Sequence, residues 1–382
     1  MSQIRTCVVG VGFIGAAHIE ALRRLGYVDV TALCDSRNSA ALAQQLHVPR
    51  AYASYEEMLD QERPDAVHIC TPNVTHFPIA KYALEHGVHV LCEKPLSYTQ
   101  EEADELVRLA EASGLVHGVN LHCRFYPMVR EMKELIQRGD LGRIFSVHGG
   151  YFQDWLLLDT DYSWRLERAC TGSTRAVADI GSHWIDAVEF VTGQRITRVL
   201  ADFATFHQTR KRPVQQVASF ENKRVQAAQY EEFPVDTEDY AQVLFQMSSG
   251  AKGSMIVSQA YAGRKNQMIL SVAGSQRALH WDSESLNELW VGERTAYNHT
   301  IVKDPALLCS GSAALCRYPG GHVEGFPDAF VQSFGAFYRA IQTGEAGAFA
   351  TFQDGRREME VCEAIARSAQ EQRWLEVASD RR

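Results

Sequence analysis

The sequence lacks the features that mark membrane proteins, disulfide-rich secreted proteins and nucleic-acid-binding proteins. No apolar run reaches the roughly 20 residues of a transmembrane helix, and a strand is expected at residues 4–9, which leaves no room for a signal peptide. The nine cysteines include no CxxC pair and have no regular spacing, which argues against a disulfide framework and a zinc site. A net charge of −9 argues against nucleic acid as the main partner, because phosphate binding requires a basic face.

The composition is that of a globular protein. Hydrophobic residues make up 46% of the chain and charged residues 22%, without an internal repeat or a low-complexity tract. A chain of 382 residues is longer than one hydrophobic core usually serves, so we expect two domains. The irregularly placed cysteines are typical of reduced thiols, and we expect a cytoplasmic protein.

The N-terminal segment carries a glycine-rich turn between a strand and a helix. The first strand leads directly into Gly10, Gly12 and Gly15, which have the spacing G-x-G-x-x-G, and a helical pattern follows as far as Leu25. In a dinucleotide-binding domain the first glycine permits the tight turn, the second lets the pyrophosphate approach, and the third lets the helix pack closely. The helix N-terminus attracts the phosphates. We therefore expect a dinucleotide along this loop, which also contains Phe13 and Ile14.

An acidic residue follows the second predicted strand. The strand covers residues 28–34, and Asp35 stands where an acid binds the ribose 2′-hydroxyl of NAD. The 2′-phosphate of NADP would be repelled by this carboxylate, although Ser36 and Arg37 could accommodate it if Asp35 moved away. The charge argument favours NAD. A second role for Asp35, as the cap of the next helix, is compatible with this one.

Strands and helices continue to alternate up to residue 121, which predicts a parallel, doubly wound sheet. In such a sheet the loops after the strands face the ligand crevice. His76 is either a nicotinamide-side contact or an ordinary histidine at a helix start, and Glu93 with Lys94 is either a site or a solvated ion pair. After the strands at residues 66–70 and 88–92 we expect these residues on the cofactor side: Thr71, Pro72, Asn73, His76, Glu93 and Lys94.

With these motifs placed, the chain resembles the glucose–fructose oxidoreductase / inositol dehydrogenase family (Gfo/Idh/MocA) over nearly its whole length. The glycine motif is generic, but the T-P-N-x-x-H loop at residues 71–76 and the E-K-P tripeptide at residues 93–95 are more specific. Residues 178–186 look like the D-x-G-x-H-x-x-D segment of the family, and residues 235–241 look like a stretch of its second domain.

This resemblance implies a Rossmann domain at residues 1–123 that binds NAD or NADP. It also implies an α+β domain at residues 124–382, with a large open, mostly antiparallel sheet whose outer face forms a homodimer or homotetramer. The C-terminal helices are expected to pack back on the first domain. The catalytic set of the family carries over to Lys94, Asp179 and His183, which are all present.

Aromatic and polar residues of the second half are of the types that recognise sugars. The Q-D-W and Y-x-W-R segments are similar to the levoglucosan dehydrogenase-type branch of the family, whose members act on unphosphorylated sugars and glycosides. Tryptophan and tyrosine are also common in cores. We expect five residues to contact the substrate together with the catalytic set: Tyr126, Gln153, Trp155, Trp164 and Arg165.

A helix expected at residues 179–191 would place Asp179, His183 and Asp186 on one face. Two carboxylates beside a histidine favour a polar site over a solvated face. The Asp–His spacing could also be half of a metal site. The missing third and fourth ligands and the available Lys94 argue against a metal, and we expect none.

The remaining sequence predicts consecutive strands joined by short turns, and hence antiparallel pairing. The basic stretch from Arg210 to Arg224 is expected to be an exposed connection. A glycine-rich loop at residues 320–326 resembles a pocket-lining segment of the sugar-oxidising branch, so His322 and Glu324 are further candidates.

The expected function is hydride transfer between a sugar, cyclitol or glycoside alcohol and the nicotinamide of NAD(P). His183 would accept the hydroxyl proton, Lys94 would hold the substrate oxygen, and Asp179 would orient His183 or bind a neighbouring hydroxyl. Two alternatives remain open at this point. One is a glycosidase that uses bound NAD without net turnover, and the other is a non-catalytic, cofactor-sensing binding protein.

Overall fold

The computed structural model describes residues 3–214 and 229–378, which form two compact units. Unit 1 contains the chain up to His122 together with Phe326–Met359. Unit 2 contains Cys123–Gly325 and the chain from Glu360 onward. Residues 326–359 therefore belong to unit 1 although they lie near the end of the sequence. None of the helices in the described ranges is both long and apolar enough to cross a membrane.

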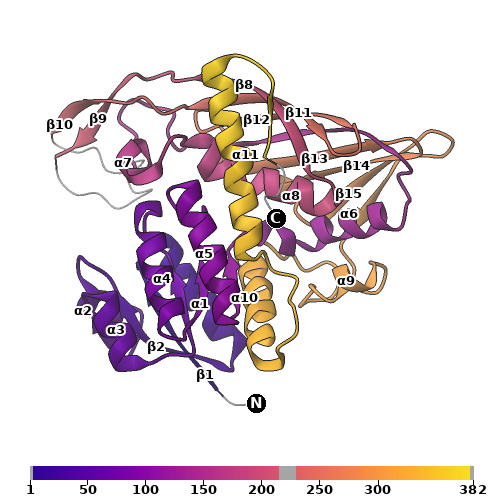
Figure 1. The fold of residues 1–382 in the computed structure, drawn as a ribbon. Helices are drawn as coiled ribbons and strands as arrows, with labels where there is room; N and C mark the ends of the chain where they lie inside the picture. Colours follow the sequence, from indigo (N-terminus) through magenta and orange to yellow (C-terminus); the bar gives the residue numbers. More distant parts are fainter. Residues whose placement is uncertain (1–2, 215–228, 379–382) are drawn as a thin grey trace. The chain divides into compact units, whose positions relative to one another are not determined.

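Unit 1 is built on a parallel sheet of six strands in the order β3-β2-β1-β4-β5-β6. This is the strand order of doubly wound dinucleotide-binding domains, and it confirms the predicted parallel sheet. Two of these strands, β1 and β2, are labelled in Figure 1. Most residues of the inner strands are apolar and buried, because helices cover both faces. The strands are β1 (Ile4–Val9), β2 (Val28–Cys34), β3 (Arg50–Tyr52), β4 (Ala66–Ile69), β5 (His89–Cys92) and β6 (His117–Val119).

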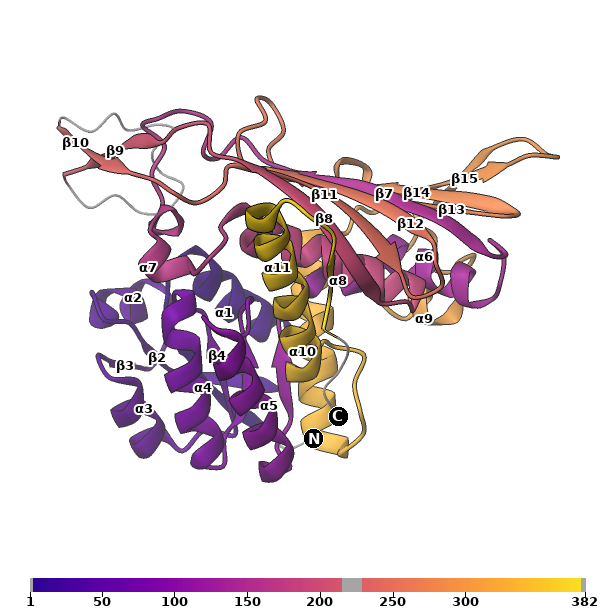
Figure 2. The same ribbon diagram turned by 45° about the horizontal axis from the view of Figure 1, so that its top comes forward.

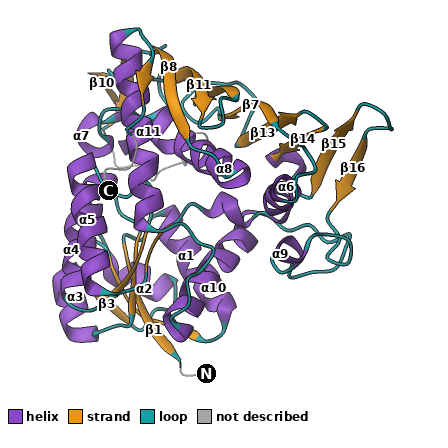
Figure 3. Ribbon diagram, turned by 45° about the vertical axis from the view of Figure 1, so that its right-hand side comes forward, coloured by secondary structure: helices purple, strands orange, loops and turns teal. Residues whose placement is uncertain are grey.

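The helices of unit 1 end and begin at recognisable sequence signals. Gly26 ends α1 in a left-handed conformation, and Thr99 and Glu102 form a reciprocal capping box at the start of α5. Helices α3, α4 and α5 lie on one side of the sheet and α1 and α10 on the other (Figure 3). The helices are α1 (Phe13–Leu25), α2 (Ser39–Gln45), α3 (Tyr55–Glu62), α4 (His76–Glu85), α5 (Gln100–Ser113) and α10 (Phe326–Thr343).

Unit 2 contains a sheet of nine strands in the order β16-β15-β14-β13-β7-β12-β11-β8-β17. Only β12 and β7 pair in parallel within it, which confirms the prediction of a mostly antiparallel sheet. A separate hairpin joins β9 (Thr209–Pro213) and β10 (Tyr230–Pro234). The nine strands are β7 (Ile144–Phe152), β8 (Ile196–Ala204), β11 (Tyr240–Met247), β12 (Lys252–Ser258), β13 (Gln267–Gly274), β14 (Arg277–Asp282), β15 (Glu288–Glu293), β16 (His299–Val302) and β17 (Leu375–Glu376).

Within the described residues, helices cover one face of this sheet and leave the other face uncovered (Figure 2). Helices α6 and α8 lie against the covered face, which we call the inner face (Figure 2). Trp184 of α8 is fully buried there, and its Nε1–H donates to the Ile269 carbonyl at 2.7 Å. Side chains of β11 alternate between buried and less buried positions, as a sheet covered on one face requires. The helices of unit 2 are α6 (Pro127–Gln137), α7 (Arg168–Thr171), α8 (Ser182–Thr192) and α9 (Ser310–Ala313), while α11 (Phe352–Glu371) begins in unit 1 and ends in unit 2.

The basic stretch that begins at Arg210 was expected to be exposed, and for Arg210 this prediction is wrong. Its side chain is fully buried, and its guanidinium donates to Asp239 at 2.6 Å and to the carbonyls of Leu156 and Leu158 at 2.9 Å. The aspartate and the carbonyls compensate the buried charge, which local composition does not reveal. Residues 215–228 of the same stretch lie outside the described residues.

Candidate active site

The turn between β1 and α1 has the backbone geometry of a dinucleotide-binding loop. Gly10 has a φ of +84°, and a Cβ there would lie 2.8 Å from the Cys70 carbonyl oxygen. A Cβ on Gly15 would lie 2.1 Å from the Gly10 carbonyl oxygen, so only glycine allows α1 to pack this closely. A Cβ on Gly12 would meet nothing within 4 Å. Packing therefore requires Gly10 and Gly15, whereas Gly12 leaves open space at the start of α1.

Further observations show that the residues at this turn fit a dinucleotide. Helix α1 begins without a side-chain cap and without an acidic residue in its first turn, which suits its positive end to a bound anion. Phe13 in that turn is 58% exposed, and Ile14 is half-buried. Beside Gly10, the buried hydroxyl of Thr71 has no hydrogen-bond partner among the described residues. A buried hydroxyl of this kind usually has a partner, and a ligand can provide one.

Asp35 lies at the end of β2 and is tied to this turn. Its carboxylate accepts the Val11 N–H at 2.9 Å and the Arg37 N–H at 3.0 Å, and its side chain is buried. Ser36 and Arg37 are exposed beside it. The carboxylate thus fixes the first two loops of the parallel sheet against each other.

The loop after β4 is held by His76, which does not have an open ring nitrogen. Its Nδ1 lies 2.8 Å from the Pro95 carbonyl oxygen, and its Nε2 lies 2.9 Å from that of Thr71. The ring is fully buried, and burial lowers the pKa of His76. The histidine therefore joins the loop after β4 to the loop after β5. Pro72 in the same loop is half-buried, and Asn73 is buried.

Lys94 follows β5 and is half-buried, between the buried Glu93 and a cis peptide bond to Pro95. The Glu93 carboxylate accepts from His18 at 3.0 Å, from Asn120 at 2.6 Å and from the Lys94 N–H at 3.2 Å. Burial alone would raise the pKa of Glu93, but the hydrogen bonds and charges of His18, Asn120 and Lys94 lower it to about 2. Glu93 is therefore a buried carboxylate that is ionised at neutral pH.

In unit 2, Asp179 is clamped between two side chains. Its Oδ1 accepts from Arg165 Nε at 3.0 Å, and its Oδ2 accepts from Gln259 Nε2 at 2.8 Å. The guanidinium of Arg165 also lies 4.6 Å from the ring centre of Trp164, a cation–π arrangement. The structure therefore brings together three predicted residues. Gln259 was missed, because nothing in its local sequence distinguishes it.

The other predicted residues of unit 2 are buried or half-buried. His183, in the first turn of α8, is buried with its ring centre 6.3 Å from that of Tyr151. Tyr126 is buried against Trp281, and Trp155 is half-buried. The Gln153 side chain donates through Nε2 to Asn266 at 2.6 Å, and its Oε1 is buried without a hydrogen-bond partner in the described ranges.

The predicted stripe of Asp179, His183 and Asp186 does not form as a single helical face. Val177–Gly181 is a π-helical turn that precedes α8, so α-helical spacing does not apply across it. Asp186 pairs instead with Arg124, whose Nε lies 2.9 Å from one carboxylate oxygen. Local pattern could not predict this, because Arg124 is distant in the sequence and the π turn depends on tertiary contacts.

Glu238 caps the π turn and was also missed as a site residue. Its carboxylate accepts the Arg175 N–H at 2.8 Å and the Val177 N–H at 2.9 Å. A signal was present, since Glu238 lies in the stretch at residues 235–241 that is similar to the family. Glu238 thus fixes the start of the segment that carries Asp179.

The glycine-rich loop at residues 320–326 has a structural role at Glu324. This carboxylate is buried, pairs with the buried Lys303 and accepts the Arg317 N–H at 2.7 Å. His322 is exposed. Both carboxylate oxygens of Glu324 are therefore engaged in holding this loop.

Two family models match the chain in succession. Residues 4–121 match the oxidoreductase family with an NAD-binding Rossmann fold, and residues 129–280 match the GFO/IDH/MocA C-terminal domain. The chain belongs to the Gfo/Idh/MocA family of oxidoreductases. The resemblance and the predicted cofactor class are thereby confirmed.

Individual relatives of this Gfo/Idh/MocA chain agree with the family models. Levoglucosan dehydrogenase from Pseudarthrobacter phenanthrenivorans is 27% identical over 394 residues, which cover 99% of each chain. D-glucoside 3-dehydrogenase from Escherichia coli is 30% identical over 195 residues, or 50% of this chain and 55% of the relative. A solved structure of levoglucosan dehydrogenase with NADH and L-sorbose superposes with a TM-score of 0.89 at 25% identity, covering 100% of both chains.

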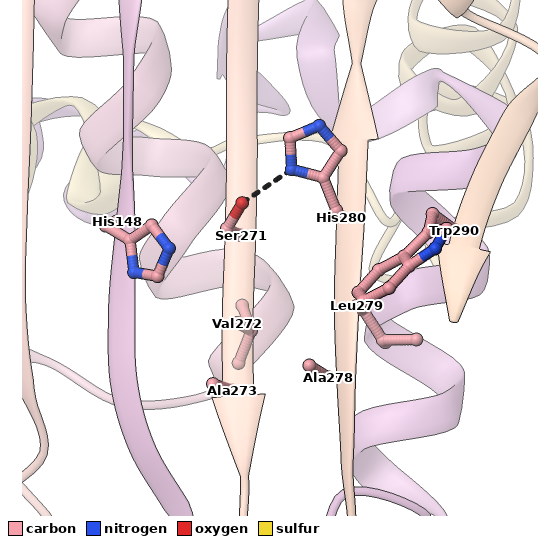
Figure 4. Close-up of a pocket in the computed structure, with 8 residues that line it drawn as sticks. All are labelled: His148, Ser271, Val272, Ala273, Ala278, Leu279, His280 and Trp290. Carbon is pink, nitrogen blue, oxygen red and sulfur yellow. Dashed lines mark hydrogen bonds between the residues drawn. The ribbon is translucent and has the colours of Figure 1, made fainter. Parts of the chain in front are cut away.

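The Gfo/Idh/MocA chain also has a pocket on the uncovered face of the nine-stranded sheet, which we call the outer face (Figure 4). Ser271 Oγ lies 2.6 Å from His280 Nδ1 in this pocket. Helix α8, which carries His183, packs on the inner face, so the pocket lies on the opposite side of the sheet from His183. It is lined by His148, Ser271, Val272, Ala273, Ala278, Leu279, His280 and Trp290.

Proposed function

We propose that this oxidoreductase is an NAD-dependent sugar dehydrogenase that oxidises a secondary alcohol of a sugar, cyclitol or glycoside. The observation that carries the substrate class is a pair of buried amide oxygens in unit 2. Both Gln153 Oε1 and Gln259 Oε1 have no hydrogen-bond partner among the described residues, while the amide nitrogens of both are engaged. Buried acceptors without donors are costly, and a ligand rich in hydroxyl groups would satisfy them.

The sugar class also draws support from the relatives. Levoglucosan dehydrogenase is similar along its full length, and its solved complex contains L-sorbose. The guanidinium of Arg165 stacks on the ring of Trp164, and Trp155 and Tyr126 belong to the same unit. Aromatic faces beside charged and amide groups suit the alternating C–H and hydroxyl surfaces of a sugar ring.

The side chains divide the reaction among three groups. NAD, when bound, supplies the nicotinamide that accepts the hydride. We assign proton acceptance to His183, because an imidazole ordinarily titrates near neutral pH. Asp179 has both carboxylate oxygens engaged by Arg165 and Gln259, so it serves as a fixed negative charge that orients His183 or a substrate hydroxyl. Lys94 donates to the substrate oxygen and stabilises its developing negative charge.

The test is a panel of free sugars, cyclitols and glycosides, scored for nicotinamide reduction with NAD and NADP in parallel. We expect NADH release with unphosphorylated sugars or glycosides, and a preference for NAD. Glycoside cleavage without NADH release would show a redox-assisted glycosidase instead, and sugar binding without turnover would show a binding protein.

The residue assignments are tested by Lys94→Met and His183→Ala. Each should lower kcat by at least about 100-fold, the usual contribution of a general acid–base group or an oxyanion donor. Matched controls are Lys81→Met on the surface of α4 and His299→Ala in β16. Near-parental turnover of either site variant at saturating cofactor would remove that residue from the mechanism.

We also propose that the protein forms a homodimer or homotetramer through the outer face of the nine-stranded sheet. Large apolar side chains are exposed on strands of this sheet: Leu244 is 42% exposed and Trp290 37%. Exposed apolar side chains on a helix-free sheet face are typical of a protein interface.

The cytoplasmic location is proposed as well, and it is supported by nine free cysteines.

A further inference from the structure

A chain of buried hydrogen bonds runs through unit 1 from Glu93 to the backbone of β4. Glu93 Oε1 lies 3.0 Å from His18 Nε2, and His18 Nδ1 lies 2.8 Å from His68 Nδ1. His68 Nε2 lies 2.9 Å from the Tyr338 hydroxyl. Both imidazoles and the tyrosine have no exposed surface. Glu93 is adjacent to Lys94, but His18, His68 and Tyr338 take no part in the proposed reaction. This row of hydrogen bonds therefore needs a separate explanation.

The far end of this chain fixes the direction of every donor. The Thr6 hydroxyl donates to the Ala66 carbonyl at 3.0 Å, so it must accept from Tyr338, whose hydroxyl donates to it at 2.8 Å. A hydroxyl has one proton, and Tyr338 therefore accepts from His68 Nε2–H. If His68 is neutral, its Nδ1 carries no proton and must accept a hydrogen bond from His18 Nδ1–H.

The near end requires a second proton on the same histidine. Glu93 Oε1 accepts from Asn120 at 2.6 Å and Oε2 accepts from the Lys94 N–H, as an ionised carboxylate does. Asn120 Nδ2 also lies 3.3 Å from His18 Nε2, but its bond to Glu93 at 2.6 Å is shorter, and an ionised Glu93 needs a donor at Nε2. We therefore assign a proton to each ring nitrogen of His18. Burial lowers the pKa of His68 well below its usual value, and the charge of His18 acts in the same direction, which agrees with a neutral His68.

We propose that His18 is a buried imidazolium that keeps Glu93 ionised and fixed against the backbone of Lys94, and that His18 is thereby a positioning residue for Lys94. The inference rests on the proposed role of Lys94. A carboxylate next to a lysine would otherwise compete with the substrate oxygen for the ammonium group. With Oε1 bonded to His18 and Asn120 and Oε2 bonded to the Lys94 peptide, that competition is reduced.

The surroundings suit a fixed charge and do not suit proton transport. The ring of His18 packs against Phe330 and Phe334 of α10, with ring centres 5.3 Å and 4.6 Å away. The hydrogen-bond chain ends on the backbone carbonyl of Ala66, which cannot take up or release a proton. The proton on His18 is therefore held in place, with Glu93 as the counter-ion that makes its burial tolerable.

The protonation states can be tested without reference to activity. Neutron diffraction from the deuterated parental protein should show deuterons on both nitrogens of His18, on Nε2 alone of His68, and none on Glu93. A single deuteron on His18, or one on the Glu93 carboxyl group, would overturn the proposal. This result is independent of the role of Lys94, so a failure of the proposed function and a failure of the inference are distinguishable.

Kinetics of His18→Gln test the positioning role. Glutamine keeps an N–H donor for Glu93 but removes the charge, so we expect kcat for the sugar to fall by about 10- to 100-fold. The dissociation constant of NADH should change less than about threefold, because the glycine turn is untouched. The matched control is His117→Asn, which removes a half-buried histidine of β6 in the same unit. If His18→Gln keeps parental kcat, or loses no more than His117→Asn, then His18 has no positioning role.

Discussion

Asp35 is a buried carboxylate that holds two loops together and that we propose also binds the cofactor. It binds the backbone of the glycine turn at Val11 and the backbone of its own loop at Arg37. Both bonds hold a negative charge at the end of β2, where the adenosine ribose lies in a dinucleotide-binding domain. The same charge would repel a 2′-phosphate.

Asp35→Ser should therefore change cofactor preference. Loss of a hydrogen bond to a charged group costs about 1.5–3 kcal/mol, so kcat/KM for NAD should fall about 10- to 100-fold while that for NADP is unchanged or rises. The measurement is steady-state kinetics with both cofactors. Asp29→Ser, at an exposed position in the same strand, is the control and should leave the ratio unchanged. An unaltered preference for NAD over NADP in Asp35→Ser would show that binding of the adenosine ribose does not depend on this carboxylate.

His117 gives unit 1 a defined sensitivity to acid. Its Nδ1 accepts the Phe352 N–H at 3.2 Å, and burial lowers the pKa of His117 from its ordinary value of 6.5 to about 4. Between pH 6.5 and pH 4 the unfolded chain binds the additional proton, so the free energy of unfolding must fall as the pH falls through this window.

The prediction is that His117→Asn flattens this dependence. Asparagine can still accept the Phe352 N–H but cannot be protonated, and the difference between pH 7 and pH 4.5 should shrink by at most about 3 kcal/mol. Urea unfolding at the two pH values measures it. If the free energy of unfolding falls by the same amount between pH 7 and pH 4.5 in both proteins, His117 is not neutral in the folded state. Protonation of Glu93 is confined to lower pH and does not interfere.

At the scale of elements, the β1–α1 turn and the π turn before α8 were not equally predictable. Glycine spacing and apolar periodicity are local signals, and they predict the turn, the helix and the parallel strands of unit 1. The π turn depends on Glu238, which reaches its backbone N–H groups from a distant strand end. The buried Arg210 depends in the same way on Asp239. Pairings between residues distant in the sequence leave no local pattern, so sequence reasoning placed Asp186 and Arg210 wrongly and did not find Gln259.

Two alanine substitutions separate the roles of the glycines in the β1–α1 turn. A Cβ at residue 12 enters open space, so Gly12→Ala should fold with a Tm close to parental but bind NADH at least about tenfold more weakly. A Cβ at residue 15 would lie 2.1 Å from the Gly10 carbonyl, so Gly15→Ala should be strongly destabilised. Thermal unfolding and NADH titration distinguish them. Parental NADH affinity in Gly12→Ala would show that the pyrophosphate does not approach there.

At the scale of the whole molecule, the outer face of the nine-stranded sheet is the surface that the fold leaves without helices. Trp290 and the pocket beside it lie on this face, away from the helices that carry His183 and cover the inner face (Figure 4). Subunit association there would bury apolar surface without involving Asp179 or His183. Association and catalysis should then be separable by mutation.

Trp290→Glu should dissociate the proposed oligomer and leave the subunit folded. A carboxylate buried in an apolar interface is costly, so sedimentation at micromolar concentration should show a smaller species, with parental secondary structure by circular dichroism. Tyr297→Glu is the control, because Tyr297 is 95% exposed in the segment after β15. A parental protein that is already monomeric, or an unchanged mass in Trp290→Glu, would contradict association through this face.

Unit 1 is built from two segments that are distant in the sequence, and this affects how the protein folds during translation. Helix α10, which supplies Tyr338 and the phenylalanines around His18, is translated about 200 residues after β6. Domains usually fold on the ribosome in the order of their synthesis, but here His18 and His68 cannot be enclosed until most of unit 2 has emerged. Until α10 is made, the face of the six-stranded sheet that carries α1 would be only partly covered, with the side of α1 that packs on α10 exposed. Chaperone dependence of the nascent chain should therefore be greatest between the synthesis of β6 and that of α10.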